Sequence, residues 1–389
     1  MVTPATKAGS KWAIATDLVD WPDSRTAAPA RHGLGNRRRY PYHSLADEIN
    51  NVMILRSPPE SWNEIPSSFA GPTHELDWFQ ACIKAFRLEP HIVAVGPPAH
   101  PRALAPLALV RGRLEAVGVR QLSEPMGFLA ADKAATLELV EALARLGLPL
   151  FLHRIPTSSP VLPALRRAWR RAILIERPMS SCPVLVLDKG WAEPEARLSS
   201  RRQSDLRRAR RRAGQIDAEV LTPTPDKTPA LVETALNVEM KSWKGRNGTA
   251  ILQLPGRADF FRRYCMMKAA DGSLRLAFLK IDGEYAAMQI AVERDDAYWV
   301  LKIGYDEKFS RCSPGQLLTS HSIGWAAARG LSSYEFLGKA EKWISLWTES
   351  QRPCVAIGVY PPRVASALAA ARDAGDLVAW KVRQRRSVE

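Results

Sequence analysis

Residues Leu274–Tyr305 read LRLAFLKIDGEYAAMQIAVERDDAYWVLKIGY. Three runs rich in apolar, β-branched and aromatic residues are separated by Asp282-Gly283 and by Arg294-Asp295-Asp296. An Asp-Gly pair between two such runs is the strongest short-range signal for a β-hairpin. The segment therefore predicts three consecutive antiparallel strands, at Leu274–Ile281, Glu284–Glu293 and Ala297–Tyr305.

The hydrophobic period changes after these strands. Ser313 followed by Pro314 is typical of a helix N-cap with proline at the first helical position, and Gly330 is typical of a helix stop. Residues Tyr334–Gly338 (YEFLG) then predict a further strand. The order along the chain is thus strand, loop, capped helix and strand.

This order favours an anion site at the start of the helix. The first-turn amides of Gly315, Gln316 and Leu317 are expected to have no partner inside the helix and to point beyond the strand end, with the positive end of the helix dipole. Arg311 lies just ahead of them and can add a charge-assisted bond to a phosphate oxygen. A well-capped helix with no ligand is the alternative for so short a motif.

In this order, the elements resemble the core of the GNAT acyltransferase superfamily, and more widely its two-domain, FemAB-like branch. That branch includes acyltransferase-like proteins linked to cellulose and exopolysaccharide synthesis. The resemblance covers roughly residues 44–347 and rests on the order and spacing of several short motifs. They are Leu198–Arg202, Asp205–Arg208, Glu239–Gly245, Thr249–Ile251, Ser313–Leu318, Glu335–Gly338 and Glu341-Lys342.

The resemblance implies an α/β (α+β) fold with two tandem GNAT-like domains, each a mixed, mostly antiparallel sheet flanked by helices. We expect a flexible leader at 1–43, an N-terminal domain at 44–180 that is structural or orients substrate, and a C-terminal catalytic domain at 181–389. Amphipathic patterning in the first domain predicts a helix at Asp132–Leu146 closed by Gly147.

The resemblance also implies a site in the second domain. Ile303 and Gly304, at the end of a strand, are expected to offer amides to the thioester carbonyl and the pantetheine arm. Glu239 or Asp306 is the candidate base and Tyr305 the candidate acid, while Trp243 and Lys244 are expected to contact the acceptor. Surface ion pairs are the alternative for both carboxylates.

One motif departs from the superfamily. Its pyrophosphate loop is usually Arg/Gln-x-x-Gly-x-Gly/Ala, and this chain has Arg311–Gln316 as RCSPGQ. Pro314 occupies a glycine position and removes one amide donor. The cofactor-binding residues that we expect are Ile303, Gly304, Arg311, Ser313, Gly315, Gln316 and Leu317.

The chain is strongly basic. Its net charge of +15 favours an anionic partner, which can be a nucleotide cofactor, a nucleic acid or an anionic surface. Seven arginines lie in Arg201–Arg212 beside a narrow apolar stripe, which is typical of a helix. The arginines of that helix either lie over its own solvated surface or bind an anion. Such an anion can be a coenzyme A phosphate, a glycan phosphate or tRNA.

The five cysteines are odd in number and scattered, without a Cys-x-x-Cys pair. This pattern argues against a disulfide framework and a zinc site and favours a reducing cytoplasm. No apolar run approaches the roughly 20 residues that a membrane helix needs.

Three functions remain open from the sequence. The first is an acyltransferase that moves an acyl group from acetyl-coenzyme A or another acyl-coenzyme A to an amine or hydroxyl of a small or sugar-derived acceptor. The second uses aminoacyl-tRNA as donor, as the FemAB-like resemblance implies, with possible tRNA binding through Arg201–Arg212. The third is a non-catalytic scaffold for nucleic acid or polysaccharide assembly.

Overall fold

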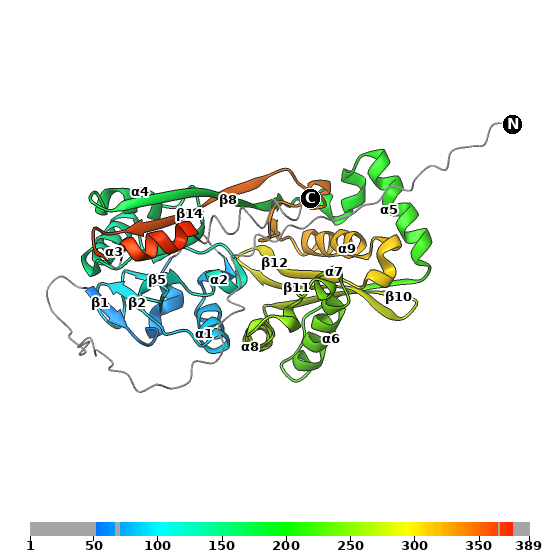
Figure 1. Cartoon of the computed structure of the whole chain (residues 1–389). Helices are drawn as coiled ribbons and strands as arrows, with labels where there is room; N and C mark the ends of the chain where they lie inside the picture. Colours follow the sequence, from blue (N-terminus) through cyan, green and yellow to red (C-terminus); the bar gives the residue numbers. More distant parts are fainter. Residues whose placement is uncertain (1–51, 67–70, 365, 376–389) are drawn as a thin grey trace.

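The computed structural model describes residues 52–66, 71–364 and 366–375 of the 389-residue chain. The predicted leader, residues 1–43, lies outside the described residues. Two groups of elements lie side by side (Figure 1). We call residues 52–172 the N-terminal half and residues 187–350 the C-terminal half.

The three strands predicted in the C-terminal half are confirmed. They are β10 (Leu274–Ile281), β11 (Glu284–Arg294) and β12 (Ala297–Tyr305). Ile281 pairs with Glu284 across the first turn, and Arg294 pairs with Ala297 across the second, in antiparallel register. Asp282 and Gly283 have φ of 50° and 82°, the left-handed values that a tight hairpin turn demands. The turn residues therefore set the register.

The helix and the fourth strand of this unit also form. Helix α9 (Pro314–Ala328) has Ser313 as its N-cap, and Gly330 follows its end with φ of 80°. Strand β13 (Ser333–Glu335) is shorter than the predicted Tyr334–Gly338. The strand ends early because Leu337 has φ of 49°, outside the extended region.

Strands from both halves build one ten-stranded sheet. Its order is β4-β5-β7-β14-β8-β13-β12-β11-β10-β9, and a second sheet has the order β1-β2-β3-β6. All strand pairs are antiparallel except β5–β7 and β12–β13. The remaining strands are β1 (Val52–Leu55), β2 (Ile92–Val95), β3 (Ala103–Ala105), β4 (Leu107–Val110), β5 (Arg113–Ala116), β6 (Leu129–Ala130), β7 (Leu150–Pro156), β8 (Ile173–Val186), β9 (Ile216–Leu221) and β14 (Gln351–Tyr360).

The long strands β8 and β14 join the two halves, as Figure 1 shows along the top of the molecule. Strand β8 leaves the N-terminal half and pairs with β13 at its far end. Strand β14 returns from the C-terminal half and pairs with both β8 and β7. The domain ranges 44–180 and 181–389 stay a prediction. The structure adds that a strand from the second range pairs with a strand from the first.

Helices cover both faces of the C-terminal strands, because alternate residues of each strand point to opposite faces. Leu276, Phe278 and Met288 pack with α6 and α8 in one buried cluster. Ala277, Leu279 and Val300 pack with α5 and α9 in another. The helices are α1 (Leu76–Phe86), α2 (Val119–Leu122), α3 (Lys133–Leu146), α4 (Val161–Ala168), α5 (Ser200–Ala213), α6 (Thr228–Met240), α7 (Trp243–Arg246) and α8 (Arg257–Ala270).

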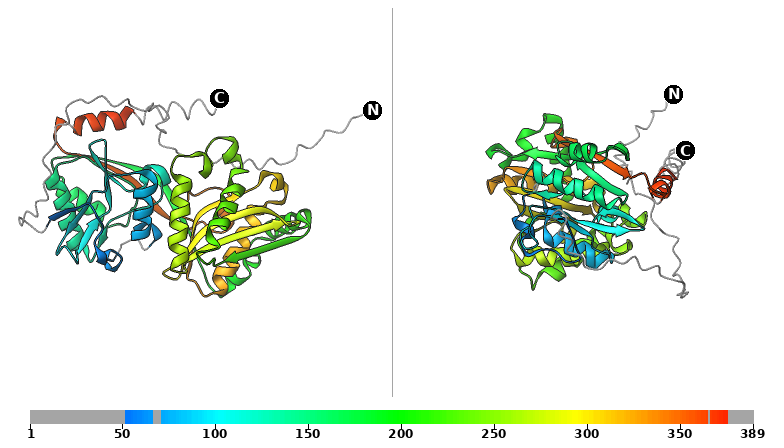
Figure 2. Two further views of the ribbon diagram at one scale, coloured as in Figure 1. Left: turned by 90° about the horizontal axis from the view of Figure 1, so that it is seen from below. Right: turned by 90° about the vertical axis from the view of Figure 1, so that its left-hand side faces the viewer.

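Aromatic packing also holds the halves together. Trp78 of α1 meets Phe260 and Tyr264 of α8 edge to face, with ring centroids 4.8 and 5.2 Å apart. Such pairs add about 0.5–1.5 kcal/mol to the burial of their area. Figure 2 shows the blue and cyan half against the green and yellow one. The sheets flanked by helices confirm the mixed α/β fold class.

None of the helices within the described ranges is both long and apolar enough to cross a lipid bilayer.

Candidate functional site

The sheet opens between β12 and β13. These strands are parallel, and they pair only from Ala297↔Ser333 to Trp299↔Glu335. Beyond this point β12 runs on to Tyr305, while the chain after β13 turns away at Leu337. We call this opening between β12 and β13 the splay.

Four of the predicted site residues meet at the end of β12. Glu239, at the end of α6, is 1% exposed, and its Oε2 accepts a hydrogen bond of 2.9 Å from the amide of Ile251. Lys244 Nζ lies 3.5 Å from Glu239 Oε1 and donates to the carbonyl of Ile303 at 3.1 Å. A Cβ on Gly304 would lie 2.9 Å from the Cα, Cβ and Cγ of Glu239, so only glycine lets the helix approach this closely.

Tyr305 lies next to the start of α9. Its Cδ1 is 3.7 Å from the position that a Cβ on Gly315 would take. Burial raises the pKa of the Tyr305 hydroxyl above its usual value, and the charge of Glu307 adds to this shift. The phenol therefore stays protonated at neutral pH and can donate a proton.

The start of α9 differs from the expectation in one respect. Gln316 and Leu317 both donate their amides to the carbonyl of Ser313, at 3.0 and 3.2 Å, so the expected free amides are wrong for these two residues. Ser313 adopts the left-handed conformation, with φ of 49° and ψ of 49°, and its carbonyl closes the first turn. Gly315 is the first-turn residue whose amide has no acceptor within the described part of the chain.

The helix start is nevertheless suited to an anion. Ser313 makes no side-chain cap and the first turn contains no acidic residue, so the helix dipole is not neutralised there. Ser313 and Arg311 are exposed, and Gly315 and Gln316 are half-buried. The Gln316 side chain links to the neighbouring loop, because it donates to the carbonyl of Trp343 and accepts from Trp347 Nε1 at 3.0 Å.

The other predicted residues take different places. Asp306 is buried and caps the 3-10 helix Glu307–Cys312 by accepting from the amide of Lys308, and Lys241 Nζ lies 3.5 Å from its Oδ2. These contacts account for Asp306 structurally. Trp243 is half-buried in α7, next to Lys244.

Further charged residues, which the sequence analysis missed or assigned to the surface, line the splay. Lys302 of β12 is half-buried, and its Nζ is 3.9 Å from Glu124 Oε1 of the N-terminal half. Burial lowers the pKa of Lys302, and the charge of Glu124 opposes that shift. Burial raises the pKa of Glu341, which accepts from Trp343 Nε1 at 2.6 Å. In the sequence, the only local indication of these charged residues was Lys302, a lysine inside the otherwise apolar strand AYWVLKIGY.

Arg154 of β7 reaches across from the N-terminal half to the splay. It is 4% exposed, and its Nη2 donates to the carbonyls of Leu337 and Gly338 at 2.7 and 3.1 Å. Arg154 and Leu337 both have positive φ, at 51° and 49°. Strained backbone of this kind persists where the surroundings hold it firmly. Arg154 therefore fixes the chain that leaves β13.

A hollow lies under the loop that follows β13. It has a volume of about 230 Å³, and Ala340, Glu341, Lys342 and Ile344 line it together with Pro183 and Gln351. The charges of Lys244 and Lys302 oppose the rise in the pKa of Glu341, so the carboxylate of this hollow lies within electrostatic range of both lysines.

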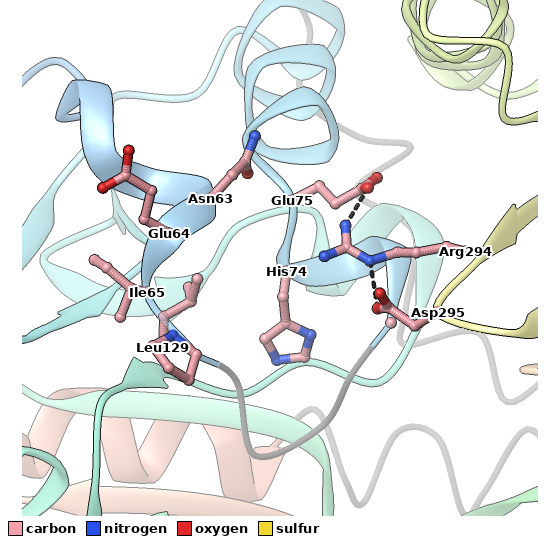
Figure 3. Close-up of a pocket in the computed structure, with 10 residues that line it drawn as sticks. Asn63, Glu64, Ile65, His74, Glu75, Leu129, Arg294 and Asp295 are labelled. Carbon is pink, nitrogen blue, oxygen red and sulfur yellow. Dashed lines mark hydrogen bonds and ion pairs between the residues drawn. The ribbon is translucent and has the colours of Figure 1, made fainter.

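A second hollow, of about 150 Å³, lies between the halves near the β11–β12 turn, at the other end of β12 from Tyr305. Figure 3 shows Arg294 between Glu75 and Asp295, with which it forms ion pairs, and His74 beside them. Burial lowers the pKa of His74 to about 3. Glu75 also lies 3.2 Å from Lys268 Nζ, so paired charges of the interface between the halves line this hollow.

Helix α5 brings positive charge close to the splay. Leu206, Ala209 and Ala213 are buried against the protein. The seven arginines are exposed. Arg212 donates to the carbonyl of Arg311, so α5 lies beside the loop that precedes α9. Asp205 and Glu195 pair with Arg208 and Arg210, while Arg201, Arg207 and Arg211 form no ion pair with a described residue.

Within the described residues, no group of three or more His, Cys, Asp and Glu side chains is arranged to hold a metal ion.

We compared the chain with known protein families, sequences and solved structures. A family model for the acetyltransferase (GNAT) domain matches residues 199–344. No curated protein sequence matches the chain. Among solved structures, FemX aligns with a TM-score of 0.53 at 11% identity, over 79% of this chain and 96% of FemX. A conserved protein of unknown function from Bacteroides thetaiotaomicron aligns with a TM-score of 0.52 at 11% identity, over 79% of this chain and 99% of that one. The two solved structures share the fold, and the family match identifies a GNAT acetyltransferase domain at residues 199–344.

Proposed function

We propose that the protein transfers an acyl group from acyl-coenzyme A to an amine or hydroxyl of a small or sugar-derived acceptor. The meeting of Glu239, Lys244 and Gly304 beside the start of α9 carries this proposal. It puts a buried carboxylate, a lysine and a close-packed strand end within one opening of the sheet. The GNAT match over residues 199–344 includes all of these residues.

In this mechanism the acceptor's nitrogen or oxygen attacks the thioester carbonyl in the splay. Glu239 takes the proton from the acceptor, directly or through a water, and the carbonyl electrons move onto oxygen. When the tetrahedral intermediate collapses, the carbon–sulfur bond breaks and the thiolate takes the proton of the Tyr305 hydroxyl. The raised pKa of Tyr305 keeps that proton available at neutral pH.

The donor's phosphates bind at the start of α9 in this proposal. The free amide of Gly315, the uncompensated helix dipole and the exposed Arg311 support this placement. Pro314 and the two amides spent on Ser313 leave fewer backbone donors than a glycine-rich loop would offer. We therefore expect Arg311 to carry a large share of the donor affinity.

The test is a titration of the full chain with acetyl-coenzyme A, by calorimetry. Saturable binding that weakens about tenfold in Arg311→Ala is expected, because one charge-assisted contact is worth about 1.4 kcal/mol in such a site. Arg167→Ala is the matched control, since Arg167 is exposed on α4 of the N-terminal half and forms no ion pair with a described residue. Equal weakening in both variants would rule out a phosphate site at α9.

A second candidate is an aminoacyl-tRNA-dependent transferase of the FemAB-like type. The exposed arginines of α5, which lie beside Arg311, favour it. Binding of charged tRNA should then fall steeply with salt, and Arg201→Ala/Arg207→Ala/Arg211→Ala should flatten that salt dependence. Saturable tRNA binding without any binding of acetyl-coenzyme A would replace the first proposal by this one. Binding of neither donor would favour the scaffold function.

A further inference from the structure

Two of the five cysteines, Cys182 and Cys354, form a pair where the halves are joined. Cys182 lies on β8 and Cys354 on β14, and their exposed fractions are 1% and 3%. The two Sγ atoms are 3.7 Å apart. A bulge in the β8–β14 ladder falls between Arg352 and Cys354, and it turns both thiols to one side.

The pair has a cationic partner. Arg154 Nη2 donates to Cys182 Sγ at 3.0 Å, and this is the nitrogen that also binds the carbonyls of Leu337 and Gly338. The hydrogen bond from Cys182, together with the charges of Arg154 and Arg352, lowers the pKa of Cys354. The same sharing raises the pKa of Cys182. The two shifts run in opposite directions, so Cys354 is the member of the pair that more readily becomes the thiolate from which a disulfide forms.

The other cysteines lack this arrangement. Cys82 and Cys265 are buried among apolar side chains, and burial raises the pKa of both thiols. Cys312 lies in the 3-10 helix ahead of α9, and no thiol of the described residues contacts it. They therefore serve as internal references for the reactivity of the pair.

We propose that Cys182 and Cys354 are a redox-modification site, which peroxide converts into a disulfide that loosens the contact of Arg154 with Leu337 and Gly338. The thiolate of Cys354 attacks one oxygen of hydrogen peroxide, forming a sulfenic acid and releasing hydroxide. The thiol of Cys182 then attacks that sulfur, the S–S bond forms and water leaves. In sum, two thiols and one peroxide give one disulfide and two waters.

The link to the splay follows from geometry. Closing the bond draws the sulfur atoms from 3.7 Å to roughly 2.05 Å, so Cys182 Sγ moves relative to the guanidinium of Arg154. Arg154 therefore loses a partner that orients it toward Leu337 and Gly338, the carbonyls that fix one wall of the splay.

The test uses the full chain and does not depend on the proposed activity. The protein is treated with hydrogen peroxide, blocked with iodoacetamide and digested without reductant. Mass spectrometry should find the Cys182–Cys354 linked peptide as the main disulfide. Cys312→Ser should leave its yield unchanged and Cys354→Ser should abolish it. Separate alkylated peptides of Cys182 and Cys354 after peroxide, or the same yield from protein unfolded in urea, would overturn the proposal.

Hydrogen exchange tests the consequence. The amides of residues 336–338 should exchange several-fold faster in the oxidised protein and return to the original rate after dithiothreitol. Exchange in α4, which lies away from the pair, is the reference. Unchanged exchange at 336–338 in fully oxidised protein would show that the disulfide does not act through Arg154.

Discussion

The two halves repeat one arrangement and complete it differently. In each, two parallel strands lie side by side with a helix between them in sequence: β5 and β7 with α3, and β12 and β13 with α9. Helix α3 starts with Asp132, whose carboxylate accepts from the amide of Ala135 at 2.7 Å. Helix α9 starts with Ser313, which makes no side-chain cap. A carboxylate on a helix start repels a phosphate, so only α9 is suited to bind one.

The two halves also differ in how closely the buried charges on their parallel strands are paired. In the N-terminal half, Arg113 of β5 is 5% exposed and pairs with Glu115 and Asp373, both also buried. Tyr360 donates to Asp373 at 2.5 Å. These charges satisfy one another. In the C-terminal half, Lys302 meets Glu124 only at 3.9 Å, and Glu124 Oε2 has no hydrogen-bond partner among the described residues. The charges around Arg113 are thus closely paired, whereas those around Lys302 are loosely paired.

The largest expected effect tests this contrast in charge pairing. Arg113→Met should lower the free energy of unfolding by about 3–5 kcal/mol, because it leaves Asp373 buried without its cation and takes from Glu115 one of its two cations, the other being Arg120. Lys302→Met should change it by less than about 1 kcal/mol, because Lys302 makes no close hydrogen bond. Urea unfolding of both variants measures this. Equal losses would mean that the charges of the splay are structural as well.

The next effect concerns the packing of the strand end. Gly304→Ala should destabilise the protein by about 1–3 kcal/mol and weaken donor binding, because its Cβ would lie 2.9 Å from Glu239. Gly315→Ala is the matched control, since the nearest atom to its Cβ is Tyr305 Cδ1 at an ordinary 3.7 Å. Thermal unfolding and acetyl-coenzyme A titration check both. If Gly304→Ala behaved like Gly315→Ala, Glu239 would not pack against β12 as described.

The two helix starts provide a third comparison. Gly315→Glu should weaken acetyl-coenzyme A binding at least about tenfold, because a carboxylate then opposes the donor's phosphates. Asp132→Ala should leave that binding unchanged and lower the stability by about 1 kcal/mol through loss of the α3 cap. Calorimetric titration and urea unfolding separate the two quantities. Loss of donor binding in Asp132→Ala would mean that the phosphates bind in the N-terminal half instead.

The last expected effect is a pH dependence that comes from the N-terminal half. Burial lowers the pKa of His153 to about 4, with the charges of Arg154 and Arg120 adding to the shift. The unfolded chain binds the proton near pH 6.5, whereas the folded one binds it only near pH 4. Stability should therefore fall as the pH drops from about 6.5 to 4, by up to about 1.4 kcal/mol per unit from this residue. His153→Gln should make urea midpoints less dependent on pH, and the exposed His100→Gln should not.

Local patterns predicted the C-terminal unit well, because its strands and helix depend on nearby residues. Asp282-Gly283 determines a hairpin, and Ser313-Pro314 with Gly330 delimits α9. The amides of Gln316 and Leu317 were missed because the left-handed conformation of Ser313 depends on how the preceding 3-10 helix meets α9. The roles of Glu239, Tyr305, Asp306, Trp243 and Lys244 stay predictions. The structure brings Glu239 and Lys244 together and gives Asp306 a capping contact.

The sequence by itself determined β10, β11, β12 and α9 in the C-terminal half and the basic surface of α5, since these follow from turn chemistry and hydrophobic period. Only the tertiary structure decided that β14 returns to β7, that Arg154 and Glu124 reach the splay, and that Cys182 lies beside Cys354. These contacts join residues that are far apart in the chain. No local pattern encodes them, because strand pairing between the two halves depends on burial of both at once.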